Sequence, residues 1–355
     1  MKMKMSKSTR SNFITYAMVI IAYVILQFMM SQGMISSSLG GQMVPICVYI
    51  VMAVSLNLTV GILGELSLGH AGFMSVGAFS GVVAAISLQS VIPNGALRLI
   101  AAVIIAGAVT AVAGILIGIP VLRLKGDYLA IVTLAFGEII KNILNNLYVG
   151  VDGSGVHVSM SSVKELGMDA GTVIINGPMG AVGITKLSTF FAGFVLILIT
   201  LFVTLNLIKS RSGRAIMAIR DNRIAAESVG INITKYKLMA FTISAAIAGA
   251  GGVLYAHNLS TVTATPTNFG YNMSIMILVF VVLGGIGNIR GSIIASVILT
   301  LLPELLRGLN DYRMLIYSIV LIVMMLFNWA PKCIEWREKV AAGFKSKKSV
   351  KKEAE

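Results

Sequence analysis

Two residues of opposite charge, Glu138 and Lys141, stand within an apolar stretch over residues 128–147. Their spacing places both side chains on one face of a helix, where the charges can neutralise each other. Each charge at the centre of a membrane helix costs roughly 2.5–3.5 kcal/mol on insertion scales. Two interpretations are open. The pair is structural or contacts a partner membrane protein, or it lines a path in which each charge meets one end of a zwitterionic solute.

No arrangement of residues in the sequence predicts an enzyme. The three histidines, His70, His157 and His257, are scattered, and no His-Glu-x-x-His motif occurs. The two cysteines, Cys47 and Cys333, fit no metal spacing or disulfide framework. No Gly-Lys dipeptide is present, so the sequence contains no phosphate-binding loop for ATP. We therefore expect no catalytic residue, no bound metal and no cofactor bound by this chain.

The composition is typical of a membrane protein. Of the 355 residues, 57% are hydrophobic and only 12% are charged, whereas soluble domains carry about 25% charged residues. A bilayer core of about 30 Å requires roughly 20 apolar residues per helix. The sequence predicts an all-α fold, a polytopic transmembrane helical bundle of about ten spans (8–10). The candidate spans are 13–31, 43–63, 66–88, 97–120, 128–147, 188–208, 238–259, 271–285, 291–306 and 313–328.

Two places in these segments are rich in glycine and predict one or two broken or re-entrant helices. One is the start of the third segment, residues 66–72, and the other is the stretch 284–288 between two short segments. Broken helices in opposite halves of a chain are expected of a transport path. The candidate path or broken-helix residues are Asn57, Glu65, Ser67, His70, Glu138, Lys141, Gly284, Gly285 and Gly287.

The placement of Lys and Arg predicts the orientation. With the amino terminus in the cytoplasm, about 22 of the 28 basic residues fall in cytoplasmic stretches. This asymmetry explains the net charge of +14 without nucleic acid. We expect a multi-pass protein of the plasma (inner) membrane, surrounded by the lipid bilayer, with both termini cytoplasmic. The first apolar run lacks a clean cleavage site, so we expect it to be retained. The expected regions are a cytoplasmic amino terminus (1–12), a transmembrane domain (13–330) with a cytoplasmic loop (209–237), and a basic cytoplasmic tail (331–355).

The cytoplasmic loop 209–237 contains signals for a short helix. Asn222 is a good N-cap and Gly230 a good residue to follow the C-cap, which together predict a helix over 223–229. A helix this short is unstable alone in water. We therefore expect this short helix to contact either the membrane surface or another protein. The longest external stretch, 148–187, is Gly-rich and polar with little periodicity.

Several segments resemble one family. They are residues 55–61, 64–71, 122–138, 230–241, 282–287 and 302–304, together with the loop around Asn222. The combination, which covers residues 43 to about 330, resembles the M-type permease subunit of branched-chain amino-acid ABC importers, a family of binding-protein-dependent inner-membrane components. The family also includes permeases for urea and short amides, so these solutes remain an alternative to leucine, isoleucine and valine.

The resemblance implies an ATP-driven importer with four further components: an H-type permease subunit, two ABC ATPase subunits and an extracytoplasmic substrate-binding protein. ATP would be used by the ATPase subunits and not by this chain. The residues implied to couple to the ATPases are Gly213, Arg214, Arg220, Asp221, Asn222, Ala225, Ala226, Glu227 and Gly230. An ion-coupled secondary transporter is the alternative class, although such carriers usually place several carboxylates or histidines in the membrane.

Overall fold

The computed structural model describes residues 7–34, 36–124, 126–153, 155–168, 171–306, 308 and 312–329. The described residues divide into two compact units between Val297 and Ile298. The predicted tail 331–355 and residues 1–6 of the predicted amino-terminal region lie outside the described residues.

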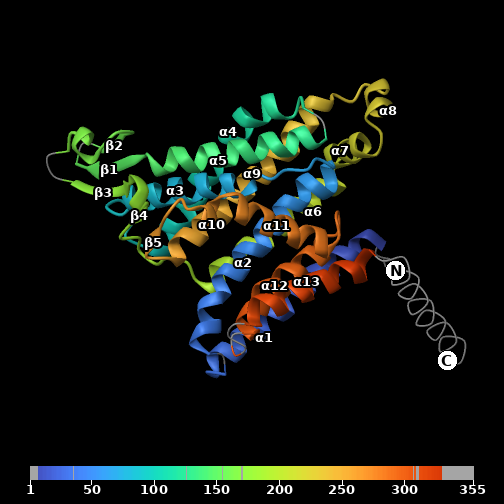
Figure 1. Ribbon diagram of the computed structural model, residues 1–355, viewed down its shortest axis with the longest axis horizontal. Coiled ribbons are helices and arrows are strands. Elements are labelled where there is room, and N and C mark those ends of the chain that lie inside the picture. Colours follow the sequence, from blue (N-terminus) through green and yellow to red (C-terminus); the bar gives the residue numbers. More distant parts are fainter. Residues whose placement is uncertain are drawn as a thin grey trace, which may run out of the picture. The chain divides into compact units, whose positions relative to one another are not determined.

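Helices account for most of the described chain (Figure 1). Their bounds are α1 Lys7–Ser31, α2 Ser37–Asn57, the π-helical turn η1 Leu58–Leu63, α3 His70–Ser87, α4 Gly95–Val121, α5 Asp127–Asn145, the 3-10 turns η2 Val163–Leu166 and η3 Gly177–Met179, α6 Phe190–Lys209, α7 Arg211–Asp221, α8 Arg223–Ser228, α9 Ile233–Asn258, α10 Pro266–Phe269, α11 Tyr271–Gly284, α12 Ile289–Leu305 and α13 Arg313–Trp329.

Seven helical segments among the described residues are long and apolar enough to cross a membrane. They are Asn12–Ser31, Ser37–Leu63, His70–Ser87, Gly95–Val121, Phe190–Lys209, Ile233–Asn258 and Pro266–Gly284. The other three predicted segments coincide with α5, α12 and α13, which fall short of the same combination of length and hydropathy. The fold class is therefore confirmed as a polytopic helical bundle, with seven spans by this measure instead of about ten.

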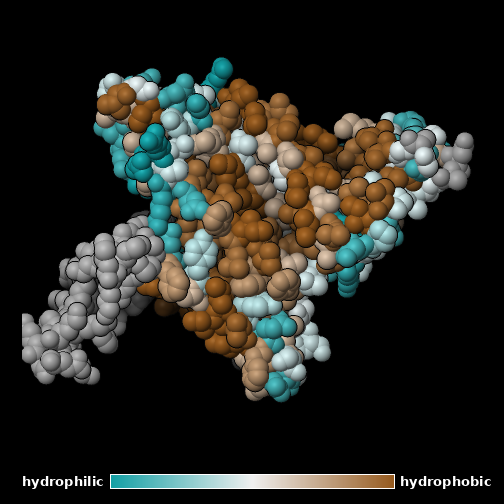
Figure 2. Space-filling model, turned by 180° about the vertical axis from the view of Figure 1, so that it is seen from behind, coloured by the Kyte–Doolittle hydropathy of each residue, from teal (hydrophilic) through white to brown (hydrophobic). Residues whose placement is uncertain are grey.

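Residues 7–297 are organised around α2 and α9. In the most apolar stretch of α2 and η1, 94% of the residues are buried, whereas only 11% are buried in that of α1. Helices α3 and α9 approach so closely that a Cβ atom on Gly77 would collide with the backbone of Gly249. Small residues permit such contacts between membrane helices. Large apolar side chains are instead exposed along α4, among them Ile104 and Leu116, and hydrophobic residues cover much of the face shown in Figure 2.

A small antiparallel sheet, which the sequence did not predict, occupies much of the stretch 148–187. Its strands are β1 Tyr148–Asp152, β2 Gly155–Ser159, β3 Gly171–Asn176, β4 Ala181–Val182 and β5 Thr261–Val262, in the order β2-β1-β3-β4-β5. Strands β4 and β5 have two residues each, too few to show an alternation of polar and apolar residues. Strand β5 follows α9, so its pairing with β4 depends on tertiary structure.

Both predicted breaks are present, one of them displaced. Helix α2 continues into η1 and ends at Gly64, which has a positive φ of 80°. Helix α3 begins only at His70, so the predicted start at residue 66 is wrong. The glycine and serine between these points leave the backbone non-helical over 65–69. Helix α11 ends at Gly284 and α12 begins at Ile289, as the stretch 284–288 predicts.

The second unit contains, in its described part, the end of α12 and helix α13. Helix α13 coincides with the predicted segment 313–328 to within one residue. Pro303 lies inside α12, near the end of the helix.

Candidate functional site

The loop 209–237 folds into two capped helices. The Ser210 hydroxyl accepts a hydrogen bond from the Gly213 backbone N–H at 3.0 Å and caps α7. Asn222 Oδ1 accepts from the Ala225 N–H at 3.0 Å and caps α8. The predicted helix over 223–229 is thus confirmed to within one residue. The sequence analysis missed α7 as a separate helix, although the Ser210 cap was a usable signal.

Gly230 ends α8 in the left-handed conformation, with φ of 82°. Its N–H donates to the Glu227 carbonyl at 3.0 Å, and the Ile231 N–H donates to the Ala226 carbonyl at 3.1 Å. These bonds satisfy carbonyl groups that the end of the helix would otherwise leave unpaired. A Cβ atom at Gly230 would meet no atom within 4 Å, so only the backbone conformation favours glycine here.

Replacing Gly230 with valine should therefore destabilise the end of α8 by about 1 kcal/mol or more, because a β-branched residue is strained at positive φ. Gly230→Asn is the matched control, since asparagine adopts this conformation far more readily. We expect reduced transport by the valine variant and nearly normal transport by the asparagine variant, at equal amounts in the membrane. Equal transport by both variants would show that the geometry at this position is unimportant.

One side of α8 rests on the protein and the other is open. Ala226 is buried and packs with Ile219 of α7 and Ile233 of α9. Ile224 and Val229 are 81% and 74% exposed. Burying two large apolar side chains would be favourable. The described residues therefore leave two large apolar side chains uncovered at this helix.

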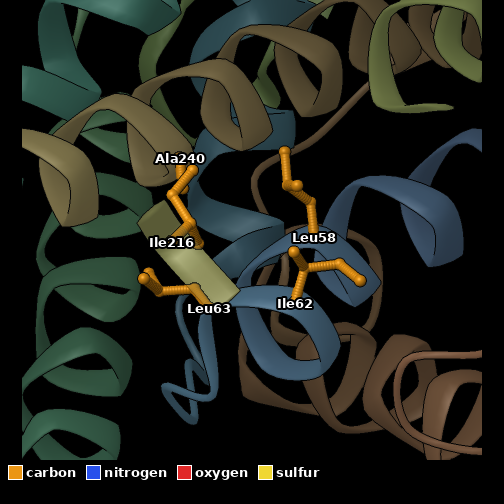
Figure 3. Close-up of a cluster of buried hydrophobic side chains, with 5 residues drawn as sticks. All are labelled: Leu58, Ile62, Leu63, Ile216 and Ala240. Atoms are coloured by element: carbon orange, nitrogen blue, oxygen red, sulfur yellow. The ribbon is translucent and has the colours of Figure 1, made fainter. Parts of the chain in front are cut away.

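Helix α7 is anchored to the π-helical turn at the end of α2. Ile216 of α7 packs into a buried cluster with Leu58, Ile62 and Leu63 of η1 and with Ala240 of α9 (Figure 3). The cluster connects three segments that are far apart in the sequence. Helix α7 and η1 therefore pack directly against each other.

Arg220, at the end of α7, strengthens this anchor. Its Nη1 donates to the Gly61 carbonyl at 2.9 Å, and its Nε and Nη2 donate to Asp221 Oδ1 at 3.0 and 2.8 Å. The Arg220 side chain also covers Gly64, where a Cβ atom would lie 2.5 Å from Arg220 Cγ. Of the other predicted coupling residues, Arg214 donates from Nη1 to the Lys209 carbonyl at 2.9 Å.

A second connection joins the first break to α9. Glu65 forms an ion pair with Lys237, and the two side chains are only 14% and 5% exposed. Glu65 was a predicted site residue, whereas its partner was not. Lys237 lies one helical turn into α9 and had been assigned only to the basic loop. No feature of the sequence indicates which of the many basic residues Glu65 meets.

Asn57 connects the two breaks directly. The residue is fully buried, and its Oδ1 accepts from the Gly287 N–H at 2.9 Å. Its Nδ2 donates to the Ser292 hydroxyl oxygen at 2.8 Å. Gly284 also lies in tight contact with Gly291, across the junction between α11 and α12. Four predicted residues (Asn57, Gly284, Gly285 and Gly287) thus lie in or against one junction.

His70 and Ser67 occupy a different place, at the start of α3. His70 is 2% exposed, and its Nε2 lies 2.6 Å from Ser55 Oγ. Ser244 of α9 donates to the Ser55 carbonyl at 2.6 Å. The Ser67 hydroxyl is buried without a hydrogen-bond partner among the described residues. These contacts hold α2, α3 and α9 together.

Glu138 and Lys141 form the pair that their spacing predicts. Glu138 also uses Oε1 to accept from the backbone N–H of Tyr271, the first residue of α11, at 2.9 Å. Through Glu138 the pair therefore connects α5 to α11, which is a structural role. That the two side chains also line a path stays a prediction. No group of three or more potential metal ligands occurs in the described part of the chain.

Comparison with known proteins gives a consistent answer. The family described as "Branched-chain amino acid transport system / permease component" matches residues 38–327. The high-affinity branched-chain amino acid transport system permease protein LivM of Salmonella typhimurium is 36% identical over 304 residues, which cover 80% of this chain and 67% of that protein.

LivM of Escherichia coli is 34% identical, with the same shares of both chains covered. The ribose import permease protein RbsC of E. coli is 26% identical over 78% of this chain and 81% of its own length. No solved structure gives a significant match.

Proposed function

Because this chain belongs to the branched-chain amino acid transport permease family and is a permease subunit of an ABC importer for these amino acids, we propose that its solutes are leucine, isoleucine and valine. The importer contains an H-type permease subunit, two ATPase subunits and an extracytoplasmic binding protein. The relatives are transport permeases and not enzymes. The hydrolysis of ATP belongs to the ATPase subunits, in agreement with a sequence that has no phosphate-binding loop.

The exposed side of α8 is the observation that supports the assignment of the ATPase contact. Ile224 of α8 and Val229, which directly follows α8, are exposed, and Ala226 fixes this short helix to the rest of the chain. A helix of this length is not stable alone. An ATPase groove that receives Ile224 and Val229 would bury both. Movement of the ATPase would then reach η1 through α7, because Ile216 and Arg220 hold the two segments together.

This contact predicts the behaviour of Ile224→Glu. A carboxylate in the buried centre of the interface should weaken association with the ATPase subunits, since an unpaired buried charge is costly. We expect the ATPases to copurify about tenfold less, with the permease still present in the membrane. Ser228→Glu, on the same helix, is the control for added charge. Undiminished copurification with Ile224→Glu would place the ATPase contact elsewhere.

The ends of α6 and α9 support an orientation. Helix α6 follows β4 and leads to the loop that contains α7 and α8, and α9 leads from that loop back to β5. The loop and the small sheet therefore lie at opposite ends of these two helices within residues 7–297 (Figure 1). The loop carries seven of the basic residues, and basic loops stay in the cytoplasm. We therefore place α7 and α8 in the cytoplasm and the sheet outside.

Cysteine labelling of intact cells tests this orientation. With Cys47 and Cys333 replaced by alanine, an impermeant thiol reagent should label Ser161→Cys, beside the sheet. It should label Ser228→Cys, in α8, only after the cells are opened. Both native serines are exposed, so access does not depend on unfolding. Labelling of both sites in intact cells would contradict the orientation.

The function itself is tested with the purified complex in proteoliposomes. Uptake of leucine should require ATP and the binding protein, and excess isoleucine or valine should compete. Uptake of urea or acetamide in place of leucine would favour the amide alternative. Uptake driven by an ion gradient without ATP would favour a secondary transporter.

A further inference from the structure

Asn57 places a polar amide side chain in a region where apolar packing alone would not require one. It is fully buried in the apolar helix α2, yet both its oxygen and its nitrogen bond residues more than 200 positions away in the chain. Polar side chains within membrane segments are costly and usually functional. The two bonds hold the stretch 284–288 near its end, through Gly287, and the first turn of α12, through Ser292.

The π-helical turn η1 begins directly after Asn57. Such turns interrupt the regular bonding of a helix and are frequent at functional sites. In η1 the Gly61 carbonyl accepts a hydrogen bond from Arg220 of α7. The Cα of the same glycine faces the Asn57 amide and the Gly287 backbone, with no room for a Cβ atom. One side of η1 therefore contacts the cytoplasmic helix, and the other side contacts the junction.

We propose that Asn57 is a positioning residue that passes the movement of α7 and α8, through η1, to the junction between α11 and α12. The proposal rests on the proposed function, since it requires the ATPase subunits to move these helices. It assigns the movement to a short series of contacts: Ile216 and Arg220 on η1, and Asn57 on Gly287 and Ser292. The junction is the element that the movement reaches, and its backbone is non-helical between the end of α11 and the start of α12, with positive φ angles of 95° at Gly285 and 81° at Gly287.

A merely structural role for Asn57 would have a different signature. Loss of packing would lower the amount of complex and reduce ATP hydrolysis and transport together. Loss of transmission would leave the complex assembled and able to hydrolyse ATP, while less solute crosses for each ATP. The ratio of leucine transported to phosphate released, measured in the same vesicles, separates the two roles.

The experiment uses the whole complex in proteoliposomes with leucine-loaded binding protein. Asn57→Leu removes both hydrogen bonds at similar volume, and the ratio should fall about tenfold. Ser292→Ala removes only one bond, so a smaller fall, about threefold, is expected. Ser75→Ala is the matched control, because that buried hydroxyl donates only to Gly72 of its own helix. Its ratio should not change.

A fluorophore provides a second readout that does not depend on the solute. It is attached at Ile286→Cys, with Cys47 and Cys333 replaced by alanine, since Ile286 is half exposed within the junction. A non-hydrolysable ATP analogue should change its emission in the complex with native Asn57. With Asn57→Leu the change should be at least about fivefold smaller.

The outcomes are separable. An unchanged ratio and an unchanged emission response in Asn57→Leu would overturn the proposal. If that variant fails to enter the membrane, Asn57→Asp and Ser292→Ala decide by the same two measurements. Aspartate keeps the acceptor for Gly287 and should give an intermediate ratio. If the complex with native Asn57 transports no leucine, the proposed solutes are wrong, and the emission response still tests the proposal.

Discussion

Lys237→Met is expected to lower the free energy of unfolding by about 3 kcal/mol, because it leaves the Glu65 carboxylate without its partner. The pair is only 5% and 14% exposed, so water can hardly replace the lost ammonium group. The estimate is at the lower end of the range for buried pairs, since Glu65 keeps some access to solvent. Thermal unfolding of the purified protein in detergent measures the change.

Two variants make this prediction specific. Lys235→Met removes an exposed ammonium group from the same helix and should change stability by less than about 0.5 kcal/mol. The double variant Glu65→Gln, Lys237→Met leaves no unpaired charge and should regain most of the stability. A double variant as unstable as Lys237→Met alone would mean that the ion pair does not explain the loss.

The sequence was sufficient where the signals are local. The caps of α8, Asn222 and Gly230, lie within nine residues of each other and define the helix without tertiary contacts. The pair of Glu138 and Lys141 follows from helical spacing alone. The break at 284–288 follows from glycines that cannot favour a continuous helix.

The sequence was insufficient where the partner lies far along the chain. Asn57 was a candidate because it is polar in an apolar segment, but its partners are 230 and 235 positions away. Lys237 carries no mark that distinguishes it from the neighbouring basic residues. Pairing between β4 and β5 joins residues 79 or more positions apart. Periodicity and composition contain no information on pairs so far apart in the sequence.

The candidate path residues lie in four places. Asn57 and the glycines lie at the junction of α11 and α12, Glu65 pairs with Lys237 just after η1, His70 and Ser67 lie at and before the start of α3, and Glu138 and Lys141 lie on α5. The junction adjoins η1 and through it α7, while Glu138 adjoins the start of α11. Helix α11 thus has polar contacts next to both of its ends.

Gly61→Ala is expected to reduce the rate of transport about tenfold or more, because the added methyl group has no space. It would meet Asn57 Oδ1, which is held by its hydrogen bond with the Gly287 N–H, and the backbone of Gly287 itself. Either η1 or the junction must move, and both are held by hydrogen bonds. Transport per ATP and the amount of assembled complex are the quantities to measure.

Gly251→Ala is the matched control for the same substitution. Gly251 is also a buried helical glycine, but a Cβ atom there would lie 3.4–3.9 Å from its nearest neighbours, which is ordinary contact. This variant should assemble and transport normally, and alanine's higher helix propensity should stabilise α9 slightly. If both variants transported normally, close contact between η1 and the junction would not be required. If both variants failed, the effect at Gly61 would reflect a general intolerance of the helix bundle to added volume. Only the failure of Gly61→Ala with normal transport by Gly251→Ala supports the specific contact.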